Sequence, residues 1–289
     1  MGSFFGNWHQ EAGLAIFTTL APSGLVAMLL LLPILFAWGG GRKGEGLRLC
    51  NYLMIPLGVT LLGFVASTIQ LGTPANALYV FTGIGRSPLS NEVLSVVVYF
   101  GLAGSYWMLS FGEWLKAPMA RAWLVTIGIS ALFALVMMGR AYSIWTIPTW
   151  SSAYVPINLL LCGLVGGSAI AAATLRVARL EAALPQAKVL LVVGPLACAV
   201  SAWFLYQQSL DLEVLVNSVT TAIALVPNYR FLIGAYVVLC IVSYGFLANS
   251  WGKHELASNT LFAIGIVAII LSVFVIRCEF YAMYMTVGF

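Results

Sequence analysis

The sequence has very little charge. Only 8% of its 289 residues are Asp, Glu, Lys or Arg, whereas 62% are hydrophobic. A soluble domain carries about 25% charged residues, so lipid is the expected solvent for most of this surface. The net charge of +4 comes from basic residues that lie singly between apolar runs, as they do in membrane loops. This distribution excludes nucleic acid as the expected partner.

Metal-ligating residues are also scarce. The sequence has two histidines, His9 and His254, and the topology predicted below places them on opposite faces. A membrane b-type haem usually needs two axial histidines inside one bundle, so we expect no haem. The five cysteines lie in separate segments without any CxxC, which excludes an iron–sulfur or zinc cluster built from this protein and argues against a disulfide framework: Cys50, Cys162, Cys198, Cys240 and Cys278. The sequence also lacks a catalytic Ser/His/Asp set and a phosphate-binding loop.

Long apolar runs are what the sequence has in abundance. A bilayer-spanning helix needs roughly 20 mostly apolar residues. Eight stretches meet that requirement: about 12–38, 50–70, 91–112, 122–143, 154–176, 187–207, 229–249 and 257–277. The segment 208–228 is too polar to span, and we expect it to lie along the surface with a short helix before Pro227. The prediction is an all-α integral membrane protein with one domain, 1–289, and no cleavable signal peptide.

Basic residues predict the orientation of these helices. Nine of the 13 Lys and Arg residues follow the first, third, fifth and seventh helices: Arg42, Lys43, Arg48, Lys116, Arg121, Arg176, Arg179, Lys188 and Lys253. Cytoplasmic loops are enriched in Lys and Arg, so both termini are predicted to be periplasmic in a bacterial inner membrane.

The opposite ends of the helices carry ionisable residues where the apolar runs begin: His9, Glu11, Glu92, Arg140, Asp211, Glu213, Arg230, Arg277 and Glu279. Charges at membrane depth normally face a bundle interior, pair or serve a function. Mixed signs near one surface therefore indicate a polar cavity roofed by loops. The competing interpretation is that about half of these side chains extend into the interface.

Residues 67–92 are the strongest candidate for a site. This stretch leaves one apolar segment through Gln70, crosses a connection rich in Gly and Pro, and enters the next segment with Glu92. We expect Ser90 to cap that helix, which places Glu92 in the first turn. A carboxylate there either complements the helix dipole or takes part in chemistry. Oxidation of a quinol needs an apolar cleft, hydrogen bonds to two oxygens and a proton acceptor, but a transporter's gate has similar residues.

Motifs spread over the whole sequence carry a family resemblance. They are IQLGTPANAL (69–78), SPLSNEVLS (87–95), IPTW (147–150), LVPNY (225–229) and MTVG (285–288), with His9 and Ile16-Phe17-Thr18 near the start. The sequence resembles the membrane anchor subunit of bacterial dimethyl sulfoxide reductase, the DmsC family. The resemblance implies an eight-helix anchor that oxidises menaquinol near the periplasmic face. Its electrons would pass to a four-cluster ferredoxin-like iron–sulfur subunit and then to a molybdopterin catalytic subunit.

Two positions depart from the family pattern. Gln70 and Tyr284 stand where the family usually has histidine. An amide can hydrogen-bond a quinol oxygen but cannot take up a proton near neutral pH. The resemblance therefore implies that Gln70 binds one quinol oxygen, while Glu92 and His9 accept protons.

The resemblance leaves two arginines and two alternative functions to be weighed. Arg277 and Arg140 would balance charge around the quinol, although a structural ion pair with Glu279 or the other acids is an equal alternative. A secondary transporter and an anchor without a quinone site of its own are the alternative functions. The centres of the helices hold almost no charge, which argues against ion-coupled transport.

Overall fold

The protein is a bundle of long helices. The computed structural model describes residues 12–40, 44–68, 74–112, 116–180, 183–253 and 255–285. Within these ranges, eight stretches are long and apolar enough to cross a membrane. They are α1 (Ala12–Ala37), α2 with α3 (Gly44–Tyr52 and Met54–Thr68), α4 (Pro88–Ser110), α5 (Ala117–Tyr142), α6 (Tyr154–Val177), α7 (Leu184–Val214), α9 (Tyr229–Ser250) and α10 (Leu256–Ala282). The predicted number and order of membrane-spanning helices is confirmed.

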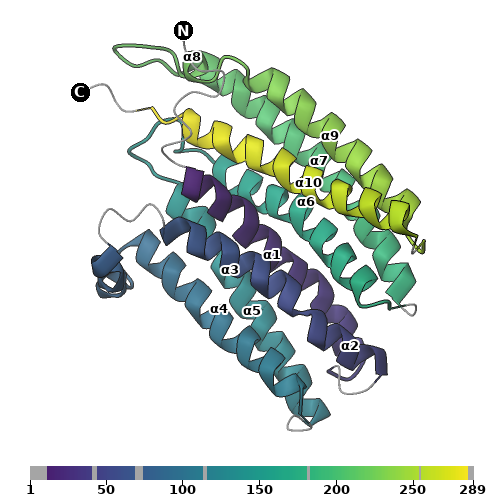
Figure 1. The fold of residues 1–289 in the computed structure, drawn as a ribbon. Coiled ribbons are helices and arrows are strands. Elements are labelled where there is room, and N and C mark those ends of the chain that lie inside the picture. The colour runs from purple at the N-terminus through teal and green to yellow at the C-terminus, as the bar shows by residue number, and fades with distance from the viewer. Residues whose placement is uncertain are drawn as a thin grey trace.

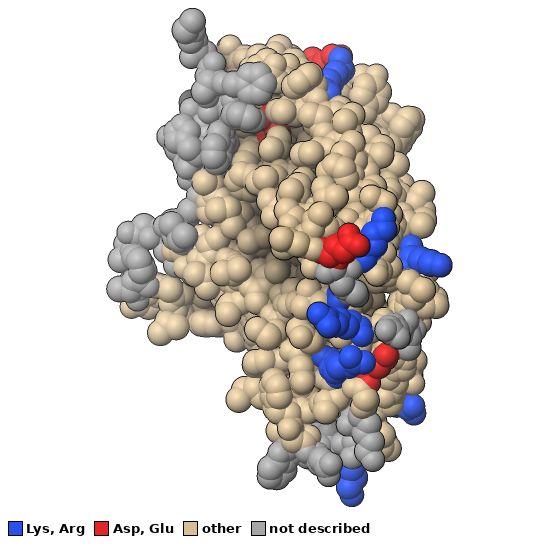
Figure 2. All heavy atoms as spheres, turned by 45° about the vertical axis from the view of Figure 1, so that its right-hand side comes forward, with Lys and Arg blue, Asp and Glu red and all other residues tan. Residues whose placement is uncertain are grey.

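Helix α1 lies at the centre of the bundle. It packs most extensively against α6 and α3, and it also contacts α5 and α10. Helices α4 and α5 form a pair on one side, and α7, α9 and α10 lie on the other (Figure 1). The start of α1 and the end of α10 lie at the same end of the bundle. On the face shown in Figure 2, Lys and Arg side chains lie mainly in one area, together with a few acidic side chains, and most of the other described surface is uncharged.

Small residues allow α6 to approach α1 closely. A Cβ atom added to Gly163 would lie 3.0 Å from Pro22 Cβ, and one added to Gly167 would lie 2.7 Å from Val26 Cβ. The two glycines are four residues apart, as are Pro22 and Val26, so each helix presents one face to the other. The GxxxG spacing in the sequence is a packing contact between the two most buried helices.

The polar segment 208–228 differs from the prediction in its first part. Helix α7 continues through Gln208 to Val214, and only the remainder forms a loop with an isolated β-bridge between Val216 and Thr221. The extension is helical because Leu212 faces the core while its polar neighbours face outward. The expected short helix before Pro227 is confirmed as α8 (Ala222–Leu225).

The connection between α3 and α4 contains regular structure. A 3₁₀-helix, η2, runs from Pro74 to Gly83. Proline at the start and glycine at the end are the residues that commonly bound a helix. This helix stands beside the start of α4 and forms one wall of the site described next.

Candidate functional site: an apolar cavity at Glu92

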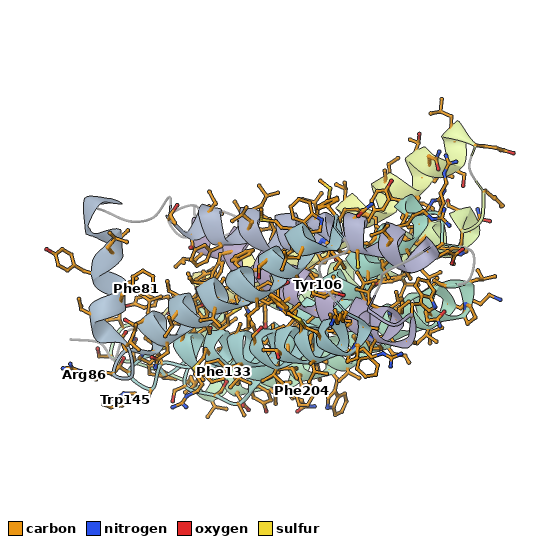
Figure 3. All side chains as sticks on the ribbon, turned by 90° about the horizontal axis from the view of Figure 1, so that it is seen from below. Phe81, Arg86, Tyr106, Phe133, Trp145 and Phe204 are labelled. Atoms are coloured by element: carbon orange, nitrogen blue, oxygen red, sulfur yellow. The ribbon has the colours of Figure 1, made fainter. Side chains whose placement is uncertain are left out.

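A cavity of about 530 Å³ lies between η2 and the neighbouring helices. Its walls come from α1, α3, η2, α4 and α5, and most of its lining is apolar. Figure 3 shows Phe81 on η2 at one end of the bundle, on the side of that helix that faces the other helices. Phe17, Phe64 and Phe81 line the cavity, and Glu92 and Tyr142 supply ionisable groups. The size falls within the roughly 300–1,000 Å³ that is typical of small-molecule sites.

The start of α4 sets the position of Glu92. The helix begins at Pro88, and Ser87 is the N-cap, with its side chain accepting a hydrogen bond from the Ser90 amide at 3.5 Å. The prediction that Ser90 caps the helix is therefore wrong, because proline fits the first helical position better and moves the start three residues earlier. Glu92 lies in the second turn, beyond the exposed amides of the helix end, so the dipole explanation for this carboxylate loses force.

Glu92 is buried and lacks protein partners. Its side chain is 1% exposed, and neither carboxylate oxygen has a hydrogen-bond partner among the described residues. A buried polar group without a partner costs free energy, so most such groups in proteins are hydrogen-bonded. Glu92 is among the residues that line the cavity, and both of its unpartnered carboxylate oxygens are buried.

A polar network lies directly behind the cavity wall. Arg277 is 2% exposed, and its Nε donates to Thr18 Oγ1 at 3.0 Å. The Tyr281 hydroxyl lies 3.3 Å from the same oxygen, and the Tyr281 ring meets Tyr142 edge to face at 6.0 Å. Tyr142 lies on the cavity wall and within electrostatic range of both Glu92 and Arg277. Arg277 therefore lies behind Tyr281 and Tyr142 and is not part of the cavity lining.

The aromatic layer around Arg277 was not predicted in detail. The Arg277 guanidinium lies 4.3 Å from the centre of the Phe280 ring, and Trp150 stacks on the same ring, with ring centres 4.8 Å apart. Trp150 Nε1 also donates to the Phe280 carbonyl at 3.0 Å. By contrast, Trp145 is 84% exposed, as an interfacial aromatic residue is expected to be. Of the two tryptophans, only Trp150 belongs to the IPTW motif of the family resemblance.

Gln70 and His9 lie outside the described residues. Thr68 and Ala77, which flank the Gln70 segment in sequence, both line the cavity. Arg140 is exposed in the last turn of α5 and is not part of the cavity lining. Of the predicted site residues, the structure thus brings Glu92 to the cavity and Arg277 behind it.

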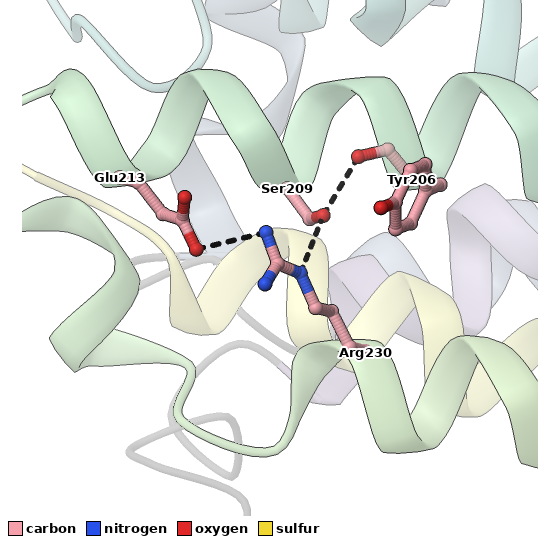
Figure 4. Close-up of polar contacts among 4 residues, drawn as sticks. All are labelled: Tyr206, Ser209, Glu213 and Arg230. Carbon is pink, nitrogen blue, oxygen red and sulfur yellow. Dashed lines mark hydrogen bonds and ion pairs between the residues drawn. The ribbon is translucent and has the colours of Figure 1, made fainter.

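The other predicted outer charges divide between burial and exposure. Glu279 is buried, whereas Asp211 is exposed. Arg230 pairs with Glu213 at 2.8 Å and donates to Ser209 Oγ at 3.1 Å, which joins α9 to α7 (Figure 4). This half-exposed pair is structural and does not line the cavity. The two described ion pairs leave Arg277 and Arg140 without a carboxylate partner among the described residues.

The eight apolar helical stretches in the described part of the chain, packed around a buried core, define it as a multi-pass membrane protein. Residues 5–283 match the family model of the DMSO reductase anchor subunit (DmsC), so the chain belongs to that family. Anchor subunits of this kind are multi-pass proteins of the bacterial inner membrane and components of an anaerobic oxidoreductase complex.

Curated relatives match along nearly their whole length. The protein is 29% identical over 287 residues to the anaerobic dimethyl sulfoxide reductase subunit YnfH of Escherichia coli, and the match spans 98% of both sequences. It is also 29% identical over 290 residues to the C subunit of the E. coli anaerobic dimethyl sulfoxide reductase, a match that spans 100% of this protein and 98% of that subunit. The C subunit of the Haemophilus influenzae enzyme is 25% identical over 280 residues, which span 96% of both sequences.

Proposed function

We propose that this anchor subunit binds menaquinol in the cavity at Glu92 and passes its electrons to an iron–sulfur subunit. The observation that carries the proposal is a buried carboxyl group, without a protein partner among the described residues, on the wall of an apolar cavity of about 530 Å³. A quinol presents an apolar ring and two hydroxyl donors, which is the complement of that lining. The membership of the protein in an anchor-subunit family supports the assignment.

The chemistry asked of the protein is limited to binding and proton transfer. Oxidation of a quinol releases two electrons and two protons. Glu92 accepts a hydrogen bond from one quinol hydroxyl and takes its proton, Gln70 bonds the other oxygen, and His9 accepts the second proton. Arg277, acting through Tyr281 and Tyr142, supplies positive charge near Glu92, and Arg140 supplies it from the helix end. The electrons leave to a cluster in the partner subunit.

The distribution of basic residues supports the orientation that we propose for the bundle. The described Lys and Arg residues that follow α1, α4, α6 and α9 lie at the end opposite the Glu92 cavity. Because basic residues favour the cytoplasmic side, we assign both termini and the cavity to the periplasmic side. The four-cluster ferredoxin-like iron–sulfur subunit and the molybdopterin catalytic subunit are placed on the same side, next to the quinol.

The test replaces the Glu92 carboxyl group with an amide of nearly the same shape. In the assembled complex, Glu92→Gln is expected to lower quinol-dependent reductase activity at least tenfold, since amide nitrogen cannot accept the proton. Activity with an artificial electron donor that bypasses the quinol site is expected to stay unchanged. The matched control is Glu213→Gln, which removes an exposed carboxylate from the same end of the bundle.

Binding is measured separately from turnover. A fluorescent quinol analogue is titrated into the purified complex, and bound quinone is extracted from the wild type. Stoichiometric quinone in the wild type, together with lost turnover in Glu92→Gln, is the expected result. Full quinol-dependent activity of Glu92→Gln would remove Glu92 from the mechanism, and a wild type without quinone would favour a purely structural anchor.

A further inference from the structure

A second cavity lies at the opposite end of the bundle. It has a volume of about 410 Å³ and lies between the end of α6, the start of α7 and the turn after α9. Arg176, Arg179, Leu184 and Trp251 are among the residues that line it. None of these residues lines the Glu92 cavity, and the quinol site proposed above makes no use of them.

Arg176 is a buried cation with neutral partners. Its side chain is 8% exposed and donates to the Ser250 carbonyl, to the Lys253 carbonyl at 2.6 Å and to Asn259 Oδ1 at 2.9 Å. The guanidinium also lies 4.3 Å from the centre of the Phe262 ring. No carboxylate pairs with it among the described residues. Buried charges are normally paired, so this cavity wall carries a positive charge that is not neutralised there.

Arg179 occupies a position that favours glycine. It follows the C-cap of α6 with a φ of 51°. The amide of Leu180 donates to the Leu175 carbonyl at 3.3 Å, and the Arg179 amide donates to the Arg176 carbonyl at 3.0 Å, which together form a Schellman motif. Glycine is the usual residue at this left-handed position because it has no Cβ.

The side chain of Arg179 is free to bind a ligand. It is exposed, and it makes no side-chain hydrogen bond or ion pair within the part of the protein that the structure describes. An arginine in a left-handed backbone conformation gains nothing for the fold, so its presence in the cavity lining calls for another explanation. Its planar guanidinium can hold two oxygens of one phosphate group.

We propose that this cavity binds the phosphate group of an anionic phospholipid. Arg179 donates to the phosphate, and buried Arg176 adds positive charge from behind it. The lipid is favoured over free phosphate because Leu184 is both part of the lining and 41% exposed, and Trp251 offers the amphipathic ring that interfaces prefer. In the orientation proposed above, this second cavity lies at the cytoplasmic side. Basic pockets between membrane helices at that side are typical sites for such headgroups.

The test measures lipid binding to the purified protein by native mass spectrometry in detergent. Cardiolipin and phosphatidylglycerol are the anionic probes, and phosphatidylcholine is the zwitterionic probe. We expect the wild type to retain the anionic lipids preferentially, and Arg179→Gln to lower their affinity about tenfold, because one charge-assisted contact is lost. The matched control is Arg121→Gln, which removes the same charge from α5, where Arg121 lies over the Phe36 ring and outside the cavity.

A second variant separates binding from folding. Arg179→Gly relieves the left-handed backbone position, so we expect thermal stability to be kept or raised while anionic lipid binding falls as in Arg179→Gln. Equal losses in Arg121→Gln and Arg179→Gln would show a diffuse surface effect and overturn the site. Displacement of the lipid by millimolar inorganic phosphate would overturn the lipid assignment, as would equal retention of phosphatidylcholine.

Discussion

Arg277 Nε on the last helix lies 3.0 Å from Thr18 Oγ1 on the first helix. The Thr18 hydroxyl donates in turn to the Leu14 carbonyl one turn earlier, so its lone pairs are free to accept from Arg277. This contact joins residues 259 positions apart in the sequence. It holds α10 against α1 directly behind the cavity that contains Glu92. The packing of the last helix on the first therefore supports the wall of the site.

The first prediction tests this contact. Thr18→Val keeps the shape of the side chain but removes the acceptor for a buried guanidinium. We expect a loss of about 1–3 kcal/mol in the free energy of unfolding, because a charged donor is left unsatisfied. The measurement is thermal unfolding in detergent. Thr126→Val is the control, since its hydroxyl bonds its own helix on an exposed face. An equal fall in Tm for both variants would contradict the special role of Thr18.

The second prediction concerns the hydroxyl that connects this network to the cavity. Tyr142 lines the cavity and lies within electrostatic range of Glu92, Tyr281 and Arg277. Tyr142→Phe removes the hydroxyl group of this side chain. We expect it to lower quinol-dependent turnover of the complex about fivefold, since the loss of one hydrogen bond costs about 1 kcal/mol. KM is expected to change less than kcat. Tyr206→Phe, at an exposed tyrosine near Arg230, serves as the control and leaves both constants unchanged.

The third prediction compares two glycines within helices. A Cβ at Gly167 would lie 2.7 Å from Val26 Cβ and 2.9 Å from the Ala27 amide nitrogen, so Gly167→Ala forces α6 away from α1. Overpacking of this kind costs about 1–3 kcal/mol. Gly101→Ala is the matched variant in α4, where a Cβ meets nothing within 4 Å. We expect it to raise stability by about 0.5–1 kcal/mol through better helix propensity. The measurement is thermal unfolding of both variants. A Gly167→Ala variant as stable as the wild type would disprove close packing between α6 and α1 at this position.

Much of this fold could be predicted because lipid imposes a strong pattern. Each membrane span needs a long apolar run, so the number and order of the helices follow from composition alone. The four-residue spacing of Gly163 and Gly167 is also visible in the sequence, and small residues at this spacing permit close approach of two helices. The end of α7 at Val214 was missed, because Gln208 and Asp211 look too polar to span. The part of a helix that extends beyond its apolar run cannot be recognised from apolar composition.

The candidate site was predictable only in part. A glutamate at a helix start is visible in the sequence, but the burial of Glu92 depends on η2, α1 and α5, which the sequence does not place beside it. Tyr142 and Phe81 escaped notice because single aromatic residues in an apolar sequence form no pattern. Arg140 and Arg277 look alike in the sequence, yet one is exposed and the other is buried, since only packing against α1 distinguishes them.

The last prediction tests whether the cavity itself is the quinol site. Val97 and Val98 are adjacent in α4 and similarly exposed, at 41% and 47%, but only Val97 lines the cavity. Val97→Trp is expected to obstruct the cavity and raise the KM for quinol at least tenfold. Activity with an artificial donor should be kept, because Glu92 and the helix core are untouched. Val98→Trp adds the same side chain next to the cavity and should leave quinol kinetics near wild type. Because both changes place a large apolar group on an exposed helix face, neither is expected to alter Tm strongly. Similar quinol kinetics in the two variants would show that quinol binds elsewhere, whatever the part played by Glu92.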